Sequence, residues 1–100
     1  MDTYEAKIQL AFRALADPSR RAMVHLLLER PMSIAELCHS FDMTRTAVRK
    51  HLRMLEEGRV VTLRLQGRER LITVDQAGLD AVREWLAVLP AQSMPRVVAG

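Results

Sequence analysis

MTRTAVRKHLRML, residues Met43–Leu55, is the stretch from which the predicted fold follows. Apolar side chains recur at helical spacing at Val48, Leu52 and Leu55, and Thr44 is a residue type that caps helix N-termini. The remaining sides carry the basic and hydroxyl residues of the stretch, which are Arg45, Thr46, Arg49, Lys50 and Arg53. The pattern therefore predicts a recognition helix with one face in the core and one cationic face.

The charges along this helix are arranged against helix stability. Basic residues from Arg45 to Lys50 lie toward the positive end of the helix dipole, and Glu56 and Glu57 lie toward the negative end. Arginines four residues apart also repel each other, by about 0.2–0.5 kcal/mol per pair. A polyanion lying across this face would turn that repulsion into attraction. A merely solvated basic face has the same pattern, so the helix alone leaves both interpretations open.

Length and composition describe one small folded domain. The chain has 100 residues, of which 49% are hydrophobic and 27% charged, and this suits one modest core. No apolar run approaches the roughly 20 residues that span a bilayer, and we see no signal peptide. Cys38, the single cysteine, cannot form an internal disulfide, so we expect a cytoplasmic protein without membrane contact. We expect the domain to span residues 1–89 and residues 90–100 to form a loosely ordered tail.

Positive charge is concentrated in about one third of the chain. The net charge is only +3, but the segment Thr44–Arg70 holds eight Lys or Arg against three Glu, a net charge of +5. The remainder holds seven basic and nine acidic residues, a net charge of −2. Such a concentration is the electrostatic footprint of a nucleic-acid-binding protein. A membrane surface is disfavoured, because a helix lying on a membrane would carry bulky aromatic residues opposite its cations.

Three helices are predicted before the recognition helix. The first spans about 2–16, with Asp2 and Glu5 as a capping pair. The second spans about 18–30, opened by Asp17 and Pro18. A short third helix opens at Ser33 on the capping box Ser33-Ile34-Ala35-Glu36. Two short helices joined by a few residues predict a helix-turn-helix.

A hairpin and a last helix are predicted after the recognition helix. Apolar and polar residues alternate over residues 61–66, Gln66-Gly67 makes the reversal, and a second alternating run returns over residues 68–74. Asp75 then caps a helix that continues to about Leu89. The predicted fold class is mainly α with a small β-hairpin, a winged helix-turn-helix ordered as four helices, two strands and one helix.

Several short motifs along the chain carry a family resemblance. They are Leu15-Ala16-Asp17-Pro18-Ser19-Arg20-Arg21, Ala35-Glu36-Leu37, Ala47-Val48, His51-Leu52, Leu55 and Gly67-Arg68. With the order of elements, they resemble the ArsR-type (arsenical-resistance repressor) family of winged-helix regulators over nearly the whole chain. The resemblance implies a homodimer that binds a palindromic double-stranded DNA operator, usually as a repressor, with its recognition helices in successive major grooves.

The chain departs from the family where many members bind an inducing metal. Cys38 matches the first of two cysteines in the third helix, but the second position is Ser40, and no histidine follows His51. We therefore expect no metal site and no cofactor, and neither zinc nor arsenite should release DNA. The sequence does not identify the inducing ligand. We expect Cys38 to be a small core residue.

A second departure is that the glycine often found just before the first wing strand comes one residue early, at Gly58. Arg59 follows it, and we leave Arg59 as a candidate phosphate contact only.

The predicted functional residues fall into two groups. The expected DNA contacts are Thr44, Arg45, Thr46, Arg49, Lys50, Arg53, Arg64, Arg68 and Arg70. The expected dimer interface consists of Tyr4, Ile8, Phe12, Val82, Trp85, Leu86 and Leu89. His25 has no acid or nucleophile at suggestive spacing, and Ser19 is an early-turn residue of the second helix, so we expect no enzyme. The alternative function is a winged-helix protein-interaction module whose basic side meets an acidic partner.

Overall fold

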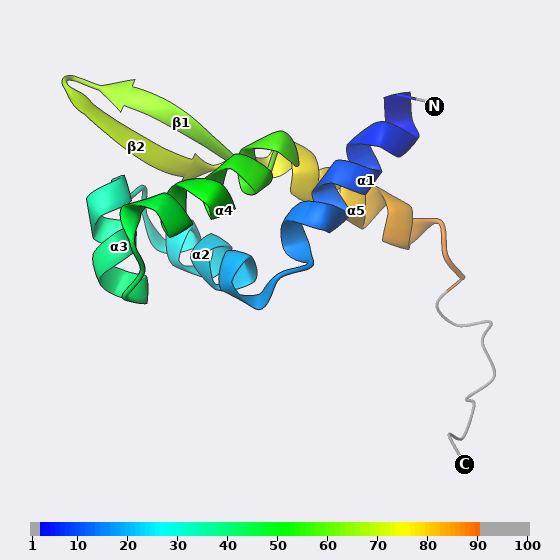
Figure 1. Ribbon diagram of the computed structural model, residues 1–100. Helices are drawn as coiled ribbons and strands as arrows, with labels where there is room; N and C mark the ends of the chain where they lie inside the picture. Colours follow the sequence, from blue (N-terminus) through cyan, green and yellow to red (C-terminus); the bar gives the residue numbers. More distant parts are fainter. Residues whose placement is uncertain (1–2, 91–100) are drawn as a thin grey trace, which may run out of the picture.

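The computed structural model describes residues 3–90, and its elements follow the predicted order (Figure 1). Their bounds are α1 Thr3–Leu15, α2 Pro18–Glu29, α3 Ile34–Phe41, α4 Arg45–Glu57, β1 Val61–Gln66, β2 Glu69–Val74 and α5 Gln76–Ala87. The predicted fold class, a mainly α winged helix-turn-helix with one hairpin, is confirmed. Asp2 of the first predicted capping pair and the predicted tail beyond Pro90 lie outside the described residues. None of the helices within residues 3–90 is long and apolar enough to span a membrane.

Side chains at the helix N-termini determine where three of the helices begin. Asp17, Thr44 and Asp75 each accept a hydrogen bond from a first-turn backbone N–H of α2, α4 and α5, at 3.1, 3.1 and 3.0 Å. Each cap satisfies a donor that the helix itself leaves open. These three predicted caps are confirmed.

The short helix α3 begins on the predicted capping box. The Ser33 hydroxyl accepts a hydrogen bond from the Glu36 N–H at 3.2 Å, and the Glu36 carboxylate accepts one from the Ser33 N–H at 3.1 Å. The carboxylate also forms an ion pair with Arg30 at 2.7 Å. The backbone hydrogen bond from Ser33 is the main reason that the pKa of Glu36 lies below its ordinary value, and Arg30 lowers it further.

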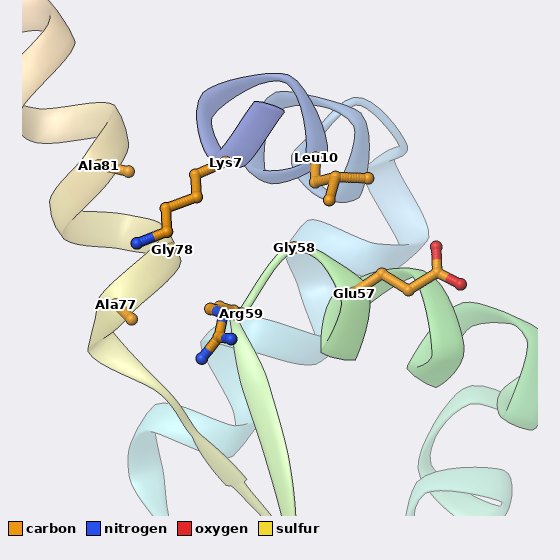
Figure 2. Close-up of a pocket in the computed structure, with 8 residues that line it drawn as sticks. All are labelled: Lys7, Leu10, Glu57, Gly58, Arg59, Ala77, Gly78 and Ala81. Atoms are coloured by element: carbon orange, nitrogen blue, oxygen red, sulfur yellow. The ribbon is translucent and has the colours of Figure 1, made fainter. Parts of the chain in front are cut away.

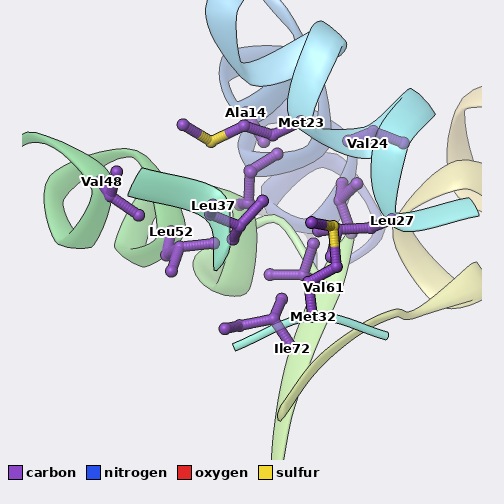
Figure 3. Close-up of a cluster of buried hydrophobic side chains, with 12 residues drawn as sticks. Ala14, Met23, Val24, Leu27, Met32, Leu37, Val48, Leu52, Val61 and Ile72 are labelled. Atoms are coloured by element: carbon purple, nitrogen blue, oxygen red, sulfur yellow. The ribbon is translucent and has the colours of Figure 1, made fainter. Parts of the chain in front are cut away.

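The core lies between α2, α3, α4 and the base of the hairpin (Figure 3). The predicted stripe of α4, Val48, Leu52 and Leu55, is at most 3% exposed. Met23 of α2 and Leu37 of α3 are fully buried in the same cluster. Burying one such side chain contributes about 1.5–3 kcal/mol. This burial fixes the rotation of α4 about its axis, and so determines which side chains of α4 stay outside.

The hairpin, here called the wing, is anchored at its base and projects away from the helices at its tip (Figure 1). At the base, Met32 and Ile72 exchange two backbone hydrogen bonds, of 3.1 and 2.7 Å. The register pairs Gln66 with Glu69, so the two loop residues are Gly67 and Arg68. The reversal thus lies one residue beyond the predicted Gln66-Gly67. Gly67 has a φ of 66°, and a positive φ at the first loop residue is what a type II′ hairpin turn requires.

The C-terminal end of α4 is a tight Schellman reversal. The Arg59 N–H donates to the Glu56 carbonyl at 3.0 Å, and the Val60 N–H donates to the Leu55 carbonyl at 2.9 Å. This motif needs one left-handed residue after the helix, usually glycine. Here that residue is Arg59, with a φ of 55°, and Gly58 is the C-cap before it.

Gly58 is needed for close packing and not for a left-handed backbone, because α1 crosses directly over it. A Cβ at Gly58 would lie 2.7 Å from the Ala14 Cβ and 2.7 Å from the Leu10 carbonyl oxygen. On its other side lies Gly78 of α5, whose N–H donates to the Arg59 carbonyl at 2.6 Å and whose own Cβ would collide with the Gly58 carbonyl oxygen. At these two glycines, α1, the end of α4 and α5 therefore meet with almost no side chain between them. No pattern in the sequence indicated this role of Gly78.

Candidate nucleic-acid interface

The recognition helix presents its predicted DNA contacts to solvent. Every one of the basic and hydroxyl side chains is exposed: Thr44, Arg45, Thr46, Arg49, Lys50 and Arg53. The Thr44 hydroxyl already accepts the hydrogen bond from the Ala47 N–H, which leaves its O–H donor and one acceptor lone pair free. The opposite side of α4 is fixed in the core, so this face cannot turn away from a ligand.

The wing meets the start of α4 across a basic groove of about 450 Å³. Arg45 and Arg49 line it from α4, and Arg68 and Arg70 line it from the wing. The first residues of α3 and the neighbouring Ser33 complete its wall. A second hollow, of about 280 Å³, lies alongside and adds Arg53 of α4 to the same surface. Two segments about twenty residues apart in the sequence thus form one cationic surface, called the basic groove below.

Arg64 does not belong to the basic groove. In an antiparallel pair, residues directly opposite each other point to the same face, and the face alternates along each strand. The register pairs Arg64 with Leu71 and Leu65 with Arg70. Arg70 therefore shares a face with Ile72, which is buried toward the helices, whereas Arg64 lies on the reverse face. The wing arginines, which were predicted as one set of DNA contacts, therefore do not all lie on the same face of the wing.

Arg59 is also separate from this surface. It lines a pocket formed by α1, the end of α4 and α5, together with Lys7 and Gly78 (Figure 2). The candidate phosphate contact of the sequence analysis is therefore placed elsewhere, because the Schellman reversal turns the chain toward α5 at this point.

The arginines of the basic groove have no protein partners within residues 3–90. Ion pairs in this part of the chain join Arg30 to Glu36, Arg83 to Asp80, and His51 to Asp17. Glu69 lines the groove but pairs with none of its arginines. Clustered like charges that remain unpaired destabilise the protein slightly, and a ligand with several negative charges removes that repulsion.

A hydrogen-bond network centred on Arg20 ties α4 to the junction of α1 and α2. The Arg20 guanidinium donates to the Ala14 carbonyl at 2.8 Å and to the Arg13 carbonyl at 3.0 Å. It also lies 3.5 Å from the Nδ1 of His51 on α4. The last carbonyls of α1 thereby gain donors, and α4 is held against the same point.

Asp17 takes part in the same network. Its carboxylate lies 4.0 Å from His51, and the hydrogen bond from the Arg20 backbone N–H is the main reason that its pKa lies below the ordinary value. The motif Asp17-Pro18-Ser19-Arg20 carried part of the family resemblance, but no sequence pattern predicted a role for Arg20. Its partners are carbonyls six and seven residues earlier, which no local pattern indicates.

Residues 3–90 contain no group of three or more His, Cys, Asp or Glu side chains placed to hold a metal ion. Cys38 is half-buried and packs against the core cluster, as predicted. The absence of metal control stays a prediction.

The predicted dimer residues lie on α1, on α5 and, for Leu89, two residues after α5, at the end of the molecule away from the wing (Figure 1). Tyr4, Phe12, Leu86 and Leu89 are exposed there, and Val82 and Trp85 are half-buried. The Phe12 and Trp85 rings pack edge to face at 5.4 Å and 89°. Ile8 is only 4% exposed, because it packs inside its own chain, so we leave it out of the exposed surface.

Comparisons with known proteins agree with this geometry. Residues 17–62 match the model of the bacterial regulatory protein family arsR. The chain is 39% identical over 83 residues to the HTH-type transcriptional regulator Rv2034 of Mycobacterium tuberculosis, covering 83% of this chain and 77% of that protein.

Solved structures show the same fold. The ArsR family transcriptional regulator RHA00566 is similar with a TM-score of 0.76 and 36% identity, over 87% of this chain and 90% of that one. A homodimeric winged helix-turn-helix DNA-binding domain from Mycobacterium bovis is similar with a TM-score of 0.68, over 88% of this chain and 83% of that one. Its identity of 22% makes that likeness one of fold alone. The chain belongs to the arsR family of bacterial regulatory proteins and is a winged-helix transcriptional regulator.

Proposed function

We propose that this arsR-family regulator is a cytoplasmic, homodimeric repressor that binds a palindromic double-stranded DNA operator. The observation that carries the proposal is the basic groove, where exposed arginines of α4 and of the wing converge without protein partners among residues 3–90. Phosphates supply most of the affinity of such a surface, because neutralising them releases condensed counterions.

The two sides of the groove are suited to different contacts. An α-helix fits the major groove, where arginine binds guanine through two hydrogen bonds, so Arg45, Thr46 and Arg49 would read base edges. Arg68 is at the tip of a hairpin, which suits contacts with the backbone or minor groove. Helix residues would therefore provide specificity, and wing residues would hold the duplex in position.

DNA binding is tested by fluorescence anisotropy with a labelled duplex from the region upstream of the chain's own gene. We expect binding that weakens as salt rises, with a slope of about 0.9 per phosphate contacted. A scrambled duplex of equal length should bind more weakly. Equal affinity for the two duplexes over a range of salt concentrations would show that the protein does not recognise this sequence.

The homodimer is supported by the apolar residues that one chain leaves exposed on α1 and α5. Such a patch on one face is typical of a protein interface, and a twofold dimer would bury it against its own copy. It would also present two recognition helices to two half-sites, about 10 base pairs or a small multiple apart.

Sedimentation of Leu86→Glu tests this interface. Leu86 is 54% exposed, so the change should disrupt association without entering the chain's own core. The matched control is Leu28→Glu on α2, because Leu28 is 53% exposed and lies outside the proposed interface. We expect the wild type and the control to be dimers and Leu86→Glu to dissociate at micromolar concentration. A monomeric wild type would overturn the proposal. Trp85→Ala is less informative, since Trp85 also packs on Phe12 within the chain.

A further inference from the structure

A pocket of about 240 Å³ lies at the meeting point of α1, the end of α4 and α5, away from the basic groove (Figure 2). Its walls are made largely of backbone and small side chains, from Gly58, Ala77, Gly78 and Ala81. The backbone contacts at the two glycines give this region a fixed shape. A volume somewhat below the roughly 300–1,000 Å³ of drug-sized ligand sites suits a small metabolite.

Two cations face this pocket, and no acidic side chain of residues 3–90 pairs with either of them. Lys7 extends from α1 toward α5, and the guanidinium of Arg59 approaches from the end of α4 (Figure 2). Within the described part of the chain, neither side chain makes an ion pair or a hydrogen bond. Glu57 also lines the pocket, but its carboxylate points away from both cations (Figure 2). The two positive charges therefore repel each other across the pocket.

The backbone of Arg59 is in the left-handed conformation. A left-handed φ of 55° is free of steric cost for glycine, whereas in other residues it brings the Cβ too close to the following carbonyl oxygen. The Schellman reversal of α4 would accept glycine at this place, and the chain has arginine there. Strained residues of this kind cluster at ligand-binding sites.

We propose that this pocket binds a small oxyanion, a carboxylate or phosphate group held between Lys7 and Arg59. An oxyanion accepts charge-assisted hydrogen bonds from both side chains and removes their repulsion. Because its ligand would touch α1, α4 and α5 together, binding should stabilise the native state. The proposal does not rest on DNA binding, since the pocket and the basic groove share no lining residue.

The test is a titration of the ¹⁵N-labelled full chain with inorganic phosphate and, separately, with malonate, at constant ionic strength set by chloride. The backbone amides of Gly58 and Gly78 report on the pocket, and the amide of Gly67 reports on the wing. We expect saturable shifts of Gly58 and Gly78 with at least one anion, and the tighter anion identifies the group. Anion binding to the basic groove would instead move Gly67. Shifts confined to Gly67, or no saturable shift at Gly58 and Gly78 with either anion, would overturn the proposal.

Three variants assign the binding to the two cations. Lys7→Gln and Arg59→Gly should each weaken binding by about tenfold, the effect of removing one charge-assisted hydrogen bond. Arg59→Gly is safe for folding, because glycine favours the left-handed conformation found there. The matched control is Arg13→Gln, which removes one positive charge from α1 outside the pocket. Equal weakening in the control, or unchanged binding in Lys7→Gln and Arg59→Gly, would contradict the assignment.

Discussion

The two ends of α4 are built on opposite principles. Its N-terminal half carries long cationic side chains that reach into solvent and form no ion pair within residues 3–90. At its C-terminal end, Gly58 and Gly78 bring three helices into backbone contact. The first end can be changed at little cost to folding, whereas the second leaves no space for even one added methyl group. DNA recognition and fold stability therefore depend on separate parts of α4. A mutation at one end should change one of these two properties and leave the other nearly unchanged.

The largest effect is expected at the recognition end, where Arg49→Ala should weaken DNA binding without weakening the fold. Losing the hydrogen bonds to one base pair costs about 1–3 kcal/mol, and the symmetry of a dimer doubles the loss. Anisotropy on the operator, and on operators changed at single positions, measures the affinity and the preference. If Arg49→Ala left both affinity and sequence preference intact on a verified operator, α4 would not be the reading element.

The opposite end is expected to show the reverse pattern in Gly78→Ala. Helix propensity alone would make alanine more stable by about 1 kcal/mol. The added Cβ would meet the Gly58 carbonyl oxygen and would lie 2.6 Å from the Arg59 carbonyl oxygen. Overpacking of this kind costs about 1–3 kcal/mol, so we expect a net loss in urea unfolding. Gly67→Ala is the comparison, because the space around Gly67 is open and only its φ opposes the change. A more stable Gly78→Ala would refute the close approach.

The Arg20 network contacts α4 between its two ends, at His51, and should show an intermediate effect. Arg20→Ala removes the donors to the Ala14 and Arg13 carbonyls and the contact with His51. We expect a loss of about 1–2 kcal/mol in the free energy of unfolding, since each net hydrogen bond contributes about 0.5–1.5 kcal/mol. Arg21→Ala is a suitable control, because it removes a single bond, to the Leu15 carbonyl. Equal losses in the two variants would mean that the network adds nothing beyond one exposed hydrogen bond.

On the wing side of the basic groove, Arg68→Ala should differ from Arg49→Ala in kind. A wing contact with phosphate carries no base information, so all sequences should bind more weakly by a similar factor. The slope of affinity against salt should fall by about 1 for each phosphate that the wing no longer neutralises. Anisotropy at several salt concentrations, with operator and scrambled duplexes, distinguishes the two arginines. A changed base preference in Arg68→Ala would assign the wing a reading role.

The smallest effect concerns the pH dependence of folding. Hydrogen bonds from the Arg20 and Ser33 backbones lower the pKa values of Asp17 and Glu36 below their ordinary values of 3.8 and 4.5. A carboxyl whose pKa is lower when folded stabilises the protein above its ordinary pKa. That contribution is lost as the pH falls through the ordinary value toward the folded one. Urea midpoints of the wild type should therefore decline in this acidic range, and those of an Asp17→Asn, Glu36→Gln double variant should decline less. Parallel profiles would show that these caps do not titrate with folding.

Most of the fold is set by local sequence. The caps Asp17, Ser33, Thr44 and Asp75 act within three residues of their own position, so residue types alone reveal them. The buried stripe of α4 follows from the period of the helix in the same way. The exposed basic face of α4 is the complement of that stripe, and it too was predictable.

Tertiary packing sets which residues meet across the chain. The strand register sends Arg70 into the basic groove and Arg64 to the reverse face, and a shift of one residue would exchange them. Burial of Ile8 inside its own chain, the carbonyl partners of Arg20, and the pocket between Lys7 and Arg59 likewise depend on how the helices cross. The two kinds of feature differ in the range of the interactions behind them. Capping and periodicity are set by neighbours within one helical turn, whereas a register, a helix crossing or a pocket is set by packing between segments that are distant in the sequence.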